Sequence, residues 1–201
     1  MTIQALPDAA PAVDPTPPVK YFVPPGRELW VFGYGSLMWK PGFDFVEKAE
    51  ARLFGYHRRL CIYSFRHRGT PERPGLVLGL DRGGSCHGMA FRVAADKVAE
   101  VTEYLWHREM ISGVYQPIMA RVRIDGRSVS AGTFVANPAH RQYCAGRDPG
   151  FMADLILQGV GQSGANPDYL FSTVAHLDTL GLRDHTLHDL AELVRARMVH
   201  R

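Results

Sequence analysis

The sequence is poor in cysteine and in long apolar runs. Its 201 residues include three cysteines, Cys61, Cys86 and Cys144, and no C-x-x-C pair. This argues against a disulfide scaffold or a cysteine-rich zinc site and favours a reducing compartment, so we predict a cytoplasmic protein. No apolar run is long enough to cross a bilayer, and the N-terminus has no basic start followed by an apolar stretch. We therefore predict neither a membrane partner nor a signal peptide.

Net charge and metal-ligand clusters are also scarce. The formal net charge of +3 is too small to argue for a nucleic-acid partner by itself. The nine histidines form no convincing metal set, because His185 and His188 have helical spacing but no third ligand stands near them. The G-x-G-x-x-G dinucleotide fingerprint also fails, since Gly33 and Gly35 are followed by Met38 where the third glycine would stand. We expect no metal and no cofactor.

The chain divides into a short tail and one domain. Residues 1–27 are rich in proline and alanine, so we predict a disordered or extended tail there. Residues 28–201 suit a single domain with a substantial core.

Strands dominate the first half of that domain and helices its last third. Apolar runs and Gly or Pro punctuation predict strands at 29–35, 51–64, 75–81, 85–93, 114–124 and 128–136. Hairpin turns are predicted at 81–84 and at 125–126. Helices are predicted at 95–110, from an N-cap at Asn166 with Pro167 in the first helical position, and at 184–199. This order indicates an α+β fold with a mixed, mostly antiparallel β-barrel or sheet and flanking helices.

The most informative stretch is residues 30–39, WVFGYGSLMW. An apolar strand enters a turn made of Gly33, Tyr34, Gly35 and Ser36, and the chain is apolar again from Leu37. A strand that ends at glycines leaves backbone N–H groups without ladder partners, and glycine lets another molecule approach them closely. With the Ser36 hydroxyl, the turn is a candidate cradle for a small anion or oxyanion. An ordinary tight turn explains the same residues.

Glu109 is an acidic residue on an apolar helix face. Val98, Val101 and Leu105 define that face at helical spacing, and Glu109 falls on it in the last turn of the predicted helix. Burial and the partial negative charge of a helix C-terminus both raise the pKa of a carboxyl group, which suits it to general acid–base catalysis. The alternative is a structural ion pair with Arg108 or with an arginine of the sheet.

Three further residues are candidates for binding a ligand. Residues 65–71, FRHRGTP, form a basic loop between two predicted strands. Arg66 and Arg68 in this loop are candidates to clamp a ligand carboxylate, because arginine binds carboxylates bidentately. A solvated basic sheet edge explains them as well. Tyr115 opens the strand after the helix, where it would line a pocket beside Glu109 or serve as a core or rim tyrosine.

Together, four motifs resemble the ChaC family of γ-glutamylcyclotransferases, in its glutathione-specific branch. The motifs are VFGYGSLMWK at 31–40, FRHRGTP at 65–71, YLWHRE at 104–109 with GVY at 113–115, and GQSGANPDYL at 161–170. The resemblance extends from about residue 29 to the C-terminus and leaves out the proline-rich tail. Met38 is a mild departure, because the family often has isoleucine there.

The resemblance implies a compact β-barrel with flanking helices, no cofactor, and a lyase activity on glutathione. In that reaction the free α-amine of the substrate attacks its own γ-glutamyl carbonyl, and the products are 5-oxoproline and Cys-Gly. Glu109 would be the general acid and base, and Tyr34, Gly35, Ser36, Leu37, Arg66, Arg68 and Tyr115 would bind the substrate.

Two other functions remain open at this point. A cyclotransferase on this fold could act on other γ-glutamyl amines. Alternatively, the chain could be a non-catalytic binding or regulatory protein on the same fold, as the family's older association with cation-transport regulation would suggest. The sequence leaves the oligomeric state open.

Overall fold

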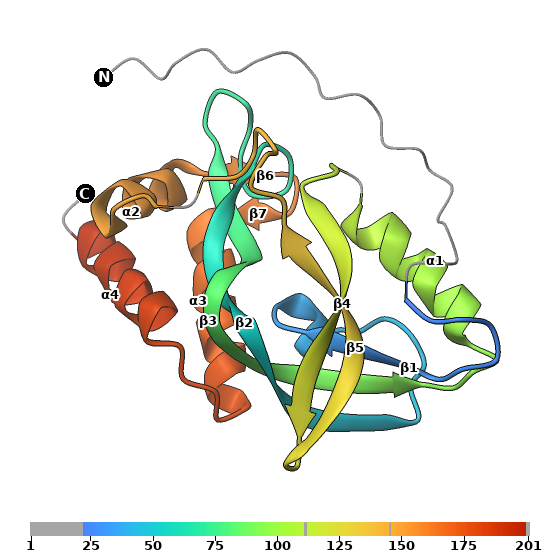
Figure 1. The fold of residues 1–201 in the computed structure, drawn as a ribbon. Coiled ribbons are helices and arrows are strands. Elements are labelled where there is room, and N and C mark those ends of the chain that lie inside the picture. The colour runs from blue at the N-terminus through green and yellow to red at the C-terminus, as the bar shows by residue number, and fades with distance from the viewer. Residues whose placement is uncertain (1–21, 111, 145, 200–201) are drawn as a thin grey trace.

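A closed five-stranded barrel forms the centre of the protein (Figure 1). This computed structural model describes residues 22–110, 112–144 and 146–199. The strands are β1 (Leu29–Gly33), β2 (Glu47–Ser64), β3 (Gly75–Val93), β4 (Tyr115–Ile124) and β5 (Arg127–Ala136). Around the barrel they follow the order β1-β3-β2-β4-β5, and each pairing is antiparallel except that of β1 with β5. The predicted α+β fold with a mixed, mostly antiparallel barrel is confirmed.

Strands β2 and β3 pair as one long bent ribbon (Figure 1). The predicted strands 75–81 and 85–93 are parts of the single strand β3, so the hairpin predicted at 81–84 is wrong. Gly83 and Gly84 have φ of +97° and +67°, and Gly55 of β2 has φ of +84°, at the point where the pairing register shifts. These glycines provide the left-handed backbone of a bulge, so the ribbon bends without ending.

The second predicted hairpin, between β4 and β5, is confirmed. Asp125 and Gly126 have φ of +46° and +79°, and the flanking residues Ile124 and Arg127 pair with each other. Positive φ at both central residues is the signature of the two-residue turn whose twist matches that of paired strands.

The helices cover two sides of the barrel. In Figure 1, α1 (Val98–Glu109) lies on one side, and α2 (Pro149–Gln158), α3 (Asn166–Thr179) and α4 (His185–Val199) gather on the other. The predicted apolar face of α1, Val98, Val101 and Leu105, is buried in a cluster with residues of β1 and with Phe134 of β5. Full burial of such a side chain contributes roughly 1.5–3 kcal/mol, so this face fixes α1, and Glu109 at its end, on the barrel.

Two helix starts differ from the prediction. The sequence reading did not include α2, which begins after Asp148, whose carboxylate accepts a hydrogen bond from the Phe151 N–H at 3.0 Å. A short hairpin of β6 (Val160–Gly161) and β7 (Gly164–Ala165) then leads into α3, and Ala165 rather than Asn166 is the N-cap residue.

Asn166 has another role. Its buried amide accepts a hydrogen bond from the Leu76 N–H at 2.6 Å and donates to the Leu76 carbonyl at 2.7 Å. The side chain therefore satisfies a backbone position of β3 and ties α3 to the barrel, which is why it does not cap the helix.

Packing against the barrel begins upstream of the predicted boundary at residue 28. Phe22 is 9% exposed, and its ring lies edge-on to that of Phe134, with 5.8 Å between the centroids. The rest of the predicted tail, residues 1–21, lies outside the described residues. Among the helices of the described ranges, none is long and apolar enough to cross a membrane.

Candidate active site

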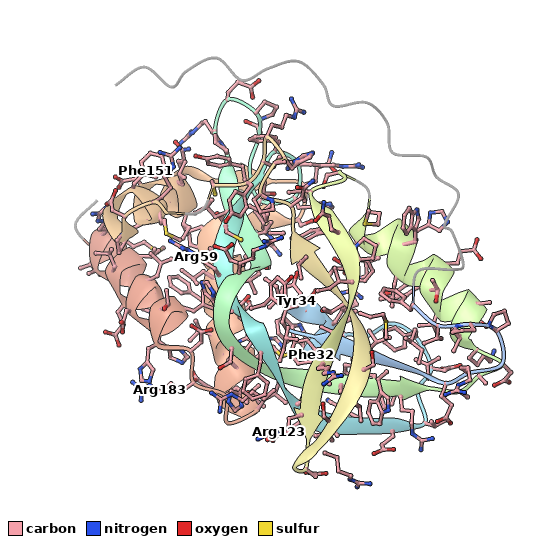
Figure 2. All side chains as sticks on the ribbon, in the orientation of Figure 1. Phe32, Tyr34, Arg59, Arg123, Phe151 and Arg183 are labelled. Atoms are coloured by element: carbon pink, nitrogen blue, oxygen red, sulfur yellow. The ribbon has the colours of Figure 1, made fainter. Side chains whose placement is uncertain are left out.

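The turn after β1 leads directly into one turn of 3₁₀ helix, η1 (Ser36–Met38). The Met38 N–H donates to the Gly35 carbonyl at 2.9 Å, and the Lys40 N–H donates to the Ser36 carbonyl at 2.8 Å. The first N–H groups of a helical turn have no partner within it, so the turn presents donors at its start. In the view of Figure 2, Tyr34 lies among the strands of the barrel, whereas Phe151 and Arg183 lie at the edge of the molecule.

A side chain at Gly33 and one at Gly35 would meet different surroundings. A Cβ at Gly33 would lie 2.9 Å from the Cβ of Leu37, so the tight return of the chain requires glycine there. Gly35 has φ of −131°, so no positive φ is needed. A Cβ at Gly35 would instead point at Leu78 Cδ1, at 3.5 Å, in the wall of a cavity. A side chain at position 35 would therefore occupy part of this cavity.

Glu109 lies in the last turn of α1, as predicted, and is its final residue; its side chain is 19% exposed. Its Oε1 lies 3.2 Å from Arg108 Nε, so the ion pair considered as an alternative does form. Burial nevertheless raises the pKa of the Glu109 carboxyl above its usual value, against the opposing effect of Arg108. The ion pair and a raised pKa thus coexist at this residue, and the latter suits a group that accepts and returns protons.

A small cavity of about 70 Å³ brings the turn, Glu109 and Tyr115 together. Besides Glu109, its wall contains five of the predicted substrate-binding residues: Tyr34, Gly35, Ser36, Leu37 and Tyr115. Leu78, Phe134 and Tyr169 complete the wall. Sequence reasoning missed these three as site residues, although Tyr169 belongs to the fourth family motif; Leu78 and Phe134 carry no local signal and reach the cavity only through barrel closure.

Three tyrosine hydroxyls near this cavity are kept neutral. Burial raises the pKa of Tyr34 and Tyr115 well above 10, and the nearby Glu109 carboxyl raises both further. Burial also raises the pKa of Tyr169 to about 12. The Tyr115 hydroxyl donates to the Leu78 carbonyl at 2.6 Å, and the Tyr169 hydroxyl accepts from the Leu78 N–H at 3.3 Å. The Tyr115 and Tyr169 hydroxyls are therefore fixed dipoles near Glu109, and none of the three tyrosines carries protons near neutral pH.

Arg108 links the acidic residue to the turn. Its Nη2 donates to Ser36 Oγ at 2.8 Å while its Nε faces Glu109. Its Nη1 donates to the Lys40 carbonyl at 2.9 Å and to the Tyr104 hydroxyl at 3.0 Å. One guanidinium thus holds the end of α1 against the turn after β1, so that Glu109 and Ser36 share a wall.

A second arginine, Arg58 of β2, holds the other side of the turn. It is 5% exposed, and its Nε donates to the Tyr34 carbonyl while its Nη2 donates to the His87 carbonyl. Its Nη1 lies 3.2 Å from Asp184 Oδ2, at the start of α4. In a trans peptide the carbonyl and the following N–H point in opposite directions, so this bond fixes the Gly35 N–H to point away from Arg58. Sequence reasoning did not identify this role of Arg58.

The two arginines predicted from the basic loop lie in different places. Arg66 lines a larger cavity of about 500 Å³, which shares Ser36, Glu109 and Tyr115 with the smaller one. Arg68 is absent from the lining residues of both cavities; it donates to the Ala165 carbonyl at 3.2 Å and lies over the Tyr169 ring, 5.1 Å from its centroid. Within the described ranges, no three His, Cys, Asp or Glu side chains gather in a way that could hold a metal ion.

Fold and geometry together define a class: a small β-barrel protein whose cavity combines a protonatable carboxyl group with backbone and hydroxyl donors. A family model described as ChaC-like protein matches residues 29–197, and the chain belongs to that family.

Two named relatives and one solved structure match most of the chain. It is 39% identical over 168 residues to "Glutathione-specific gamma-glutamylcyclotransferase" of Escherichia coli K12, covering 83% of this chain and 73% of that protein. It is 30% identical over 200 residues to "Glutathione-specific gamma-glutamylcyclotransferase 1" of Homo sapiens, and the match covers 96% of this chain and 90% of that protein. The crystal structure of a yeast γ-glutamyl cyclotransferase specific to glutathione matches with a TM-score of 0.77 at 22% identity, covering 84% of this chain and 96% of that one. The structural match supports the fold.

Proposed function

We propose that this protein is a γ-glutamylcyclotransferase that cleaves glutathione to 5-oxoproline and Cys-Gly. The observation that carries the proposal is the position of Glu109, a carboxyl group with a raised pKa in the wall of the cavity formed by the Tyr34–Leu37 turn. The names of the relatives in Escherichia coli and Homo sapiens, both glutathione-specific, indicate the substrate.

The chemistry is an internal aminolysis in which Glu109 moves protons off the attacking nitrogen and onto the leaving one. Glu109 takes a proton from the substrate's α-ammonium and passes it to solvent, and the free amine attacks the γ-carbonyl carbon to close a five-membered ring. Glu109 then takes the second proton from the ring nitrogen and delivers it to the nitrogen of Cys-Gly as the tetrahedral intermediate expels that nitrogen, and the released amine takes up one more proton from water. No bond to the enzyme forms, so no nucleophile is needed, and no electrons are transferred to a cofactor.

The remaining site residues bind and orient. We assign the donors of the Tyr34–Leu37 turn to the glutamyl end, including the oxygen that becomes negative in the intermediate. The neutral hydroxyls of Tyr34 and Tyr115 add dipoles beside Glu109. Holding the chain bent, with the amine against its own carbonyl, contributes through orientation. Arg108 keeps Glu109 and Ser36 in register.

One experiment separates this function from the two alternatives. Purified protein is incubated with glutathione and, separately, with γ-glutamyl-alanine, and 5-oxoproline release is measured. Release from glutathione in preference to the dipeptide supports the proposal, and preference for the dipeptide favours a cyclotransferase for other γ-glutamyl amines. No 5-oxoproline from either substrate, with glutathione binding retained, favours a non-catalytic binding protein.

We also propose a cytoplasmic location and a lyase classification. The three cysteines are free and buried, and burial raises the pKa of the Cys61, Cys86 and Cys144 thiols, to about 11 for Cys86 and about 12 for Cys144. Buried neutral thiols fit a chain that works in a reducing compartment. Fractionation of cells that express the protein, followed by immunoblotting, tests the location.

A further inference from the structure

The larger cavity is an unassigned space that opens beside the catalytic carboxyl group. At about 500 Å³ it is several times larger than the cavity of about 70 Å³ that holds the turn. Both share Ser36, Glu109 and Tyr115, so they meet at the proton-transfer residue. A substrate with its reacting bond at Glu109 would therefore have one end in each cavity.

Its wall is cationic and partly aromatic. Arg66, Arg108 and Arg141 line it, and Glu109 is the one acidic residue among its described lining residues. Arg108 is engaged with Glu109, as described above. Arg141 lies over the Phe65 ring, 6.0 Å from its centroid, and Arg66 Nε donates to Gln162 Oε1 at 2.9 Å. These contacts orient two positively charged groups along the wall.

The segment that carries Arg141 is fastened to β2. The Gln142 carbonyl accepts from the Tyr63 N–H at 2.7 Å, and Gln142 Nε2 donates to the Tyr63 carbonyl at 2.7 Å. The Cys144 N–H donates to the Cys61 carbonyl at 2.9 Å. Because the residues that directly follow it are hydrogen-bonded to β2, Arg141 is presented from a fixed platform.

The geometry of the proposed reaction determines what enters this cavity. Glu109 must reach both the α-amine and the leaving nitrogen, so the glutamyl part belongs in the small cavity with the turn. The rest of the substrate, Cys-Gly, must extend beyond Glu109. Its glycine carboxylate lies at most about 7 Å further on, at roughly 3.5 Å per extended residue, and is ionised near neutral pH.

We propose, on the basis of the proposed function, that the larger cavity is the Cys-Gly subsite and that Arg141 and Arg66 bind the terminal carboxylate of glutathione. This interaction gives the enzyme its preference for a tripeptide that ends in a free carboxylate. Charge-assisted bonds from arginine to carboxylate are short and geometrically specific, which suits them to this discrimination.

The test removes the terminal carboxylate from the substrate and, separately, the guanidinium groups from the protein. The kcat/KM is measured for glutathione and for glutathione with a C-terminal carboxamide, on wild type, Arg141→Gln, Arg66→Gln and the double variant. Removing a charged hydrogen-bond partner is expected to cost about 10–100-fold. For wild type, kcat/KM should be lower by this factor for the carboxamide than for glutathione. For the double variant, kcat/KM for glutathione should fall by the same factor relative to wild type, and kcat/KM for the carboxamide should fall little further.

Arg147→Gln serves as the matched control. Arg147 is exposed, lies over the Phe151 ring at 5.4 Å and is absent from the lining of the larger cavity, so its variant should keep wild-type ratios. Equal turnover of both substrates by wild type, or an equal loss on both by the double variant, overturns the subsite while leaving the cyclotransferase activity intact. A wild type that releases no 5-oxoproline from any γ-glutamyl substrate instead refutes the proposed function.

Discussion

Arg58 provides a prediction that links stability to the site, although its own side chain lines neither cavity. Its guanidinium donates to the carbonyls of Tyr34 and His87 and pairs with Asp184 at 3.2 Å. Replacing it by lysine keeps the positive charge but removes the planar fork that serves these partners in different directions. Replacing it by methionine removes the charge as well.

The structure sets the expected magnitudes. Arg58→Met leaves the Asp184 carboxylate, 17% exposed, without its partner and leaves two buried carbonyls without their donor. Breaking such a pair costs about 3–5 kcal/mol, a large part of the roughly 5–15 kcal/mol that stabilises a domain. Arg58→Lys should cost about 1–3 kcal/mol, because some carbonyl oxygens lose a donor. With the Tyr34 carbonyl released, the Gly35 N–H is no longer fixed, so kcat for glutathione should fall by about tenfold or more.

Urea denaturation and glutathione kinetics measure both effects. Arg59→Lys is the control, because Arg59 is the sequence neighbour of Arg58, has its own partner Asp81 at 3.7 Å, and lines neither cavity. That control should lose less than about 1 kcal/mol and keep wild-type kcat. If Arg58→Lys matches wild type in both stability and kcat, the reasoning that this guanidinium orients the turn is wrong.

Three further predictions concern the carboxyl group, the turn and metals. Because the pKa of Glu109 is raised in the folded state, its carboxyl group contributes stability below the unfolded pKa of about 4.3, and this stability is lost as pH rises through the folded pKa. Glu109→Gln should therefore have a higher melting temperature than wild type at pH 7 and an equal one at pH 4. A lower melting temperature of the variant at pH 7 contradicts this. Gly35→Val should abolish glutathione binding, because the new side chain fills the space before Leu78. Ser36→Ala loses a partner of Arg108 and should weaken binding by about 1–3 kcal/mol, as measured by titration calorimetry. If Ser36→Ala loses more binding than Gly35→Val, the turn is not a cradle for the substrate. Exhaustive EDTA treatment should leave full activity. If EDTA abolishes activity and zinc or manganese restores it, the reaction requires a metal ion.

Local patterns in the sequence predicted much of the fold. The apolar face of α1, the Asp125–Gly126 hairpin and the strand-rich first half follow from periodicity and turn chemistry, which act over a few neighbouring residues. The bulge at Gly83 and Gly84 was misread as a hairpin because the same glycines serve both structures. Only the partner strand, with Gly55 opposite, decides between them, and that pairing is not local.

The site was predictable where one residue departed from its surroundings. Glu109 on an apolar face, and the glycine turn after β1, could be recognised without a structure, and barrel closure places both in one cavity. The contributions of Leu78 and Phe134 could not be recognised, because ordinary apolar residues become site residues only through tertiary contact. Arg58 and Arg141 could not be distinguished from the other arginines of the sequence. The role of Arg58 depends on partners 24, 29 and 126 residues away in the chain, and the proposed role of Arg141 depends on its place in a cavity wall.

The central claim is that Glu109 transfers the proton in the cyclisation of glutathione. The most direct measurement is 5-oxoproline release by Glu109→Gln, whose side chain keeps the shape of glutamate but cannot accept a proton, with its melting curve recorded to show that it is folded. The account predicts a loss of about 10²–10⁴-fold in kcat with glutathione binding retained. Near-wild-type release of 5-oxoproline by the folded variant would contradict it.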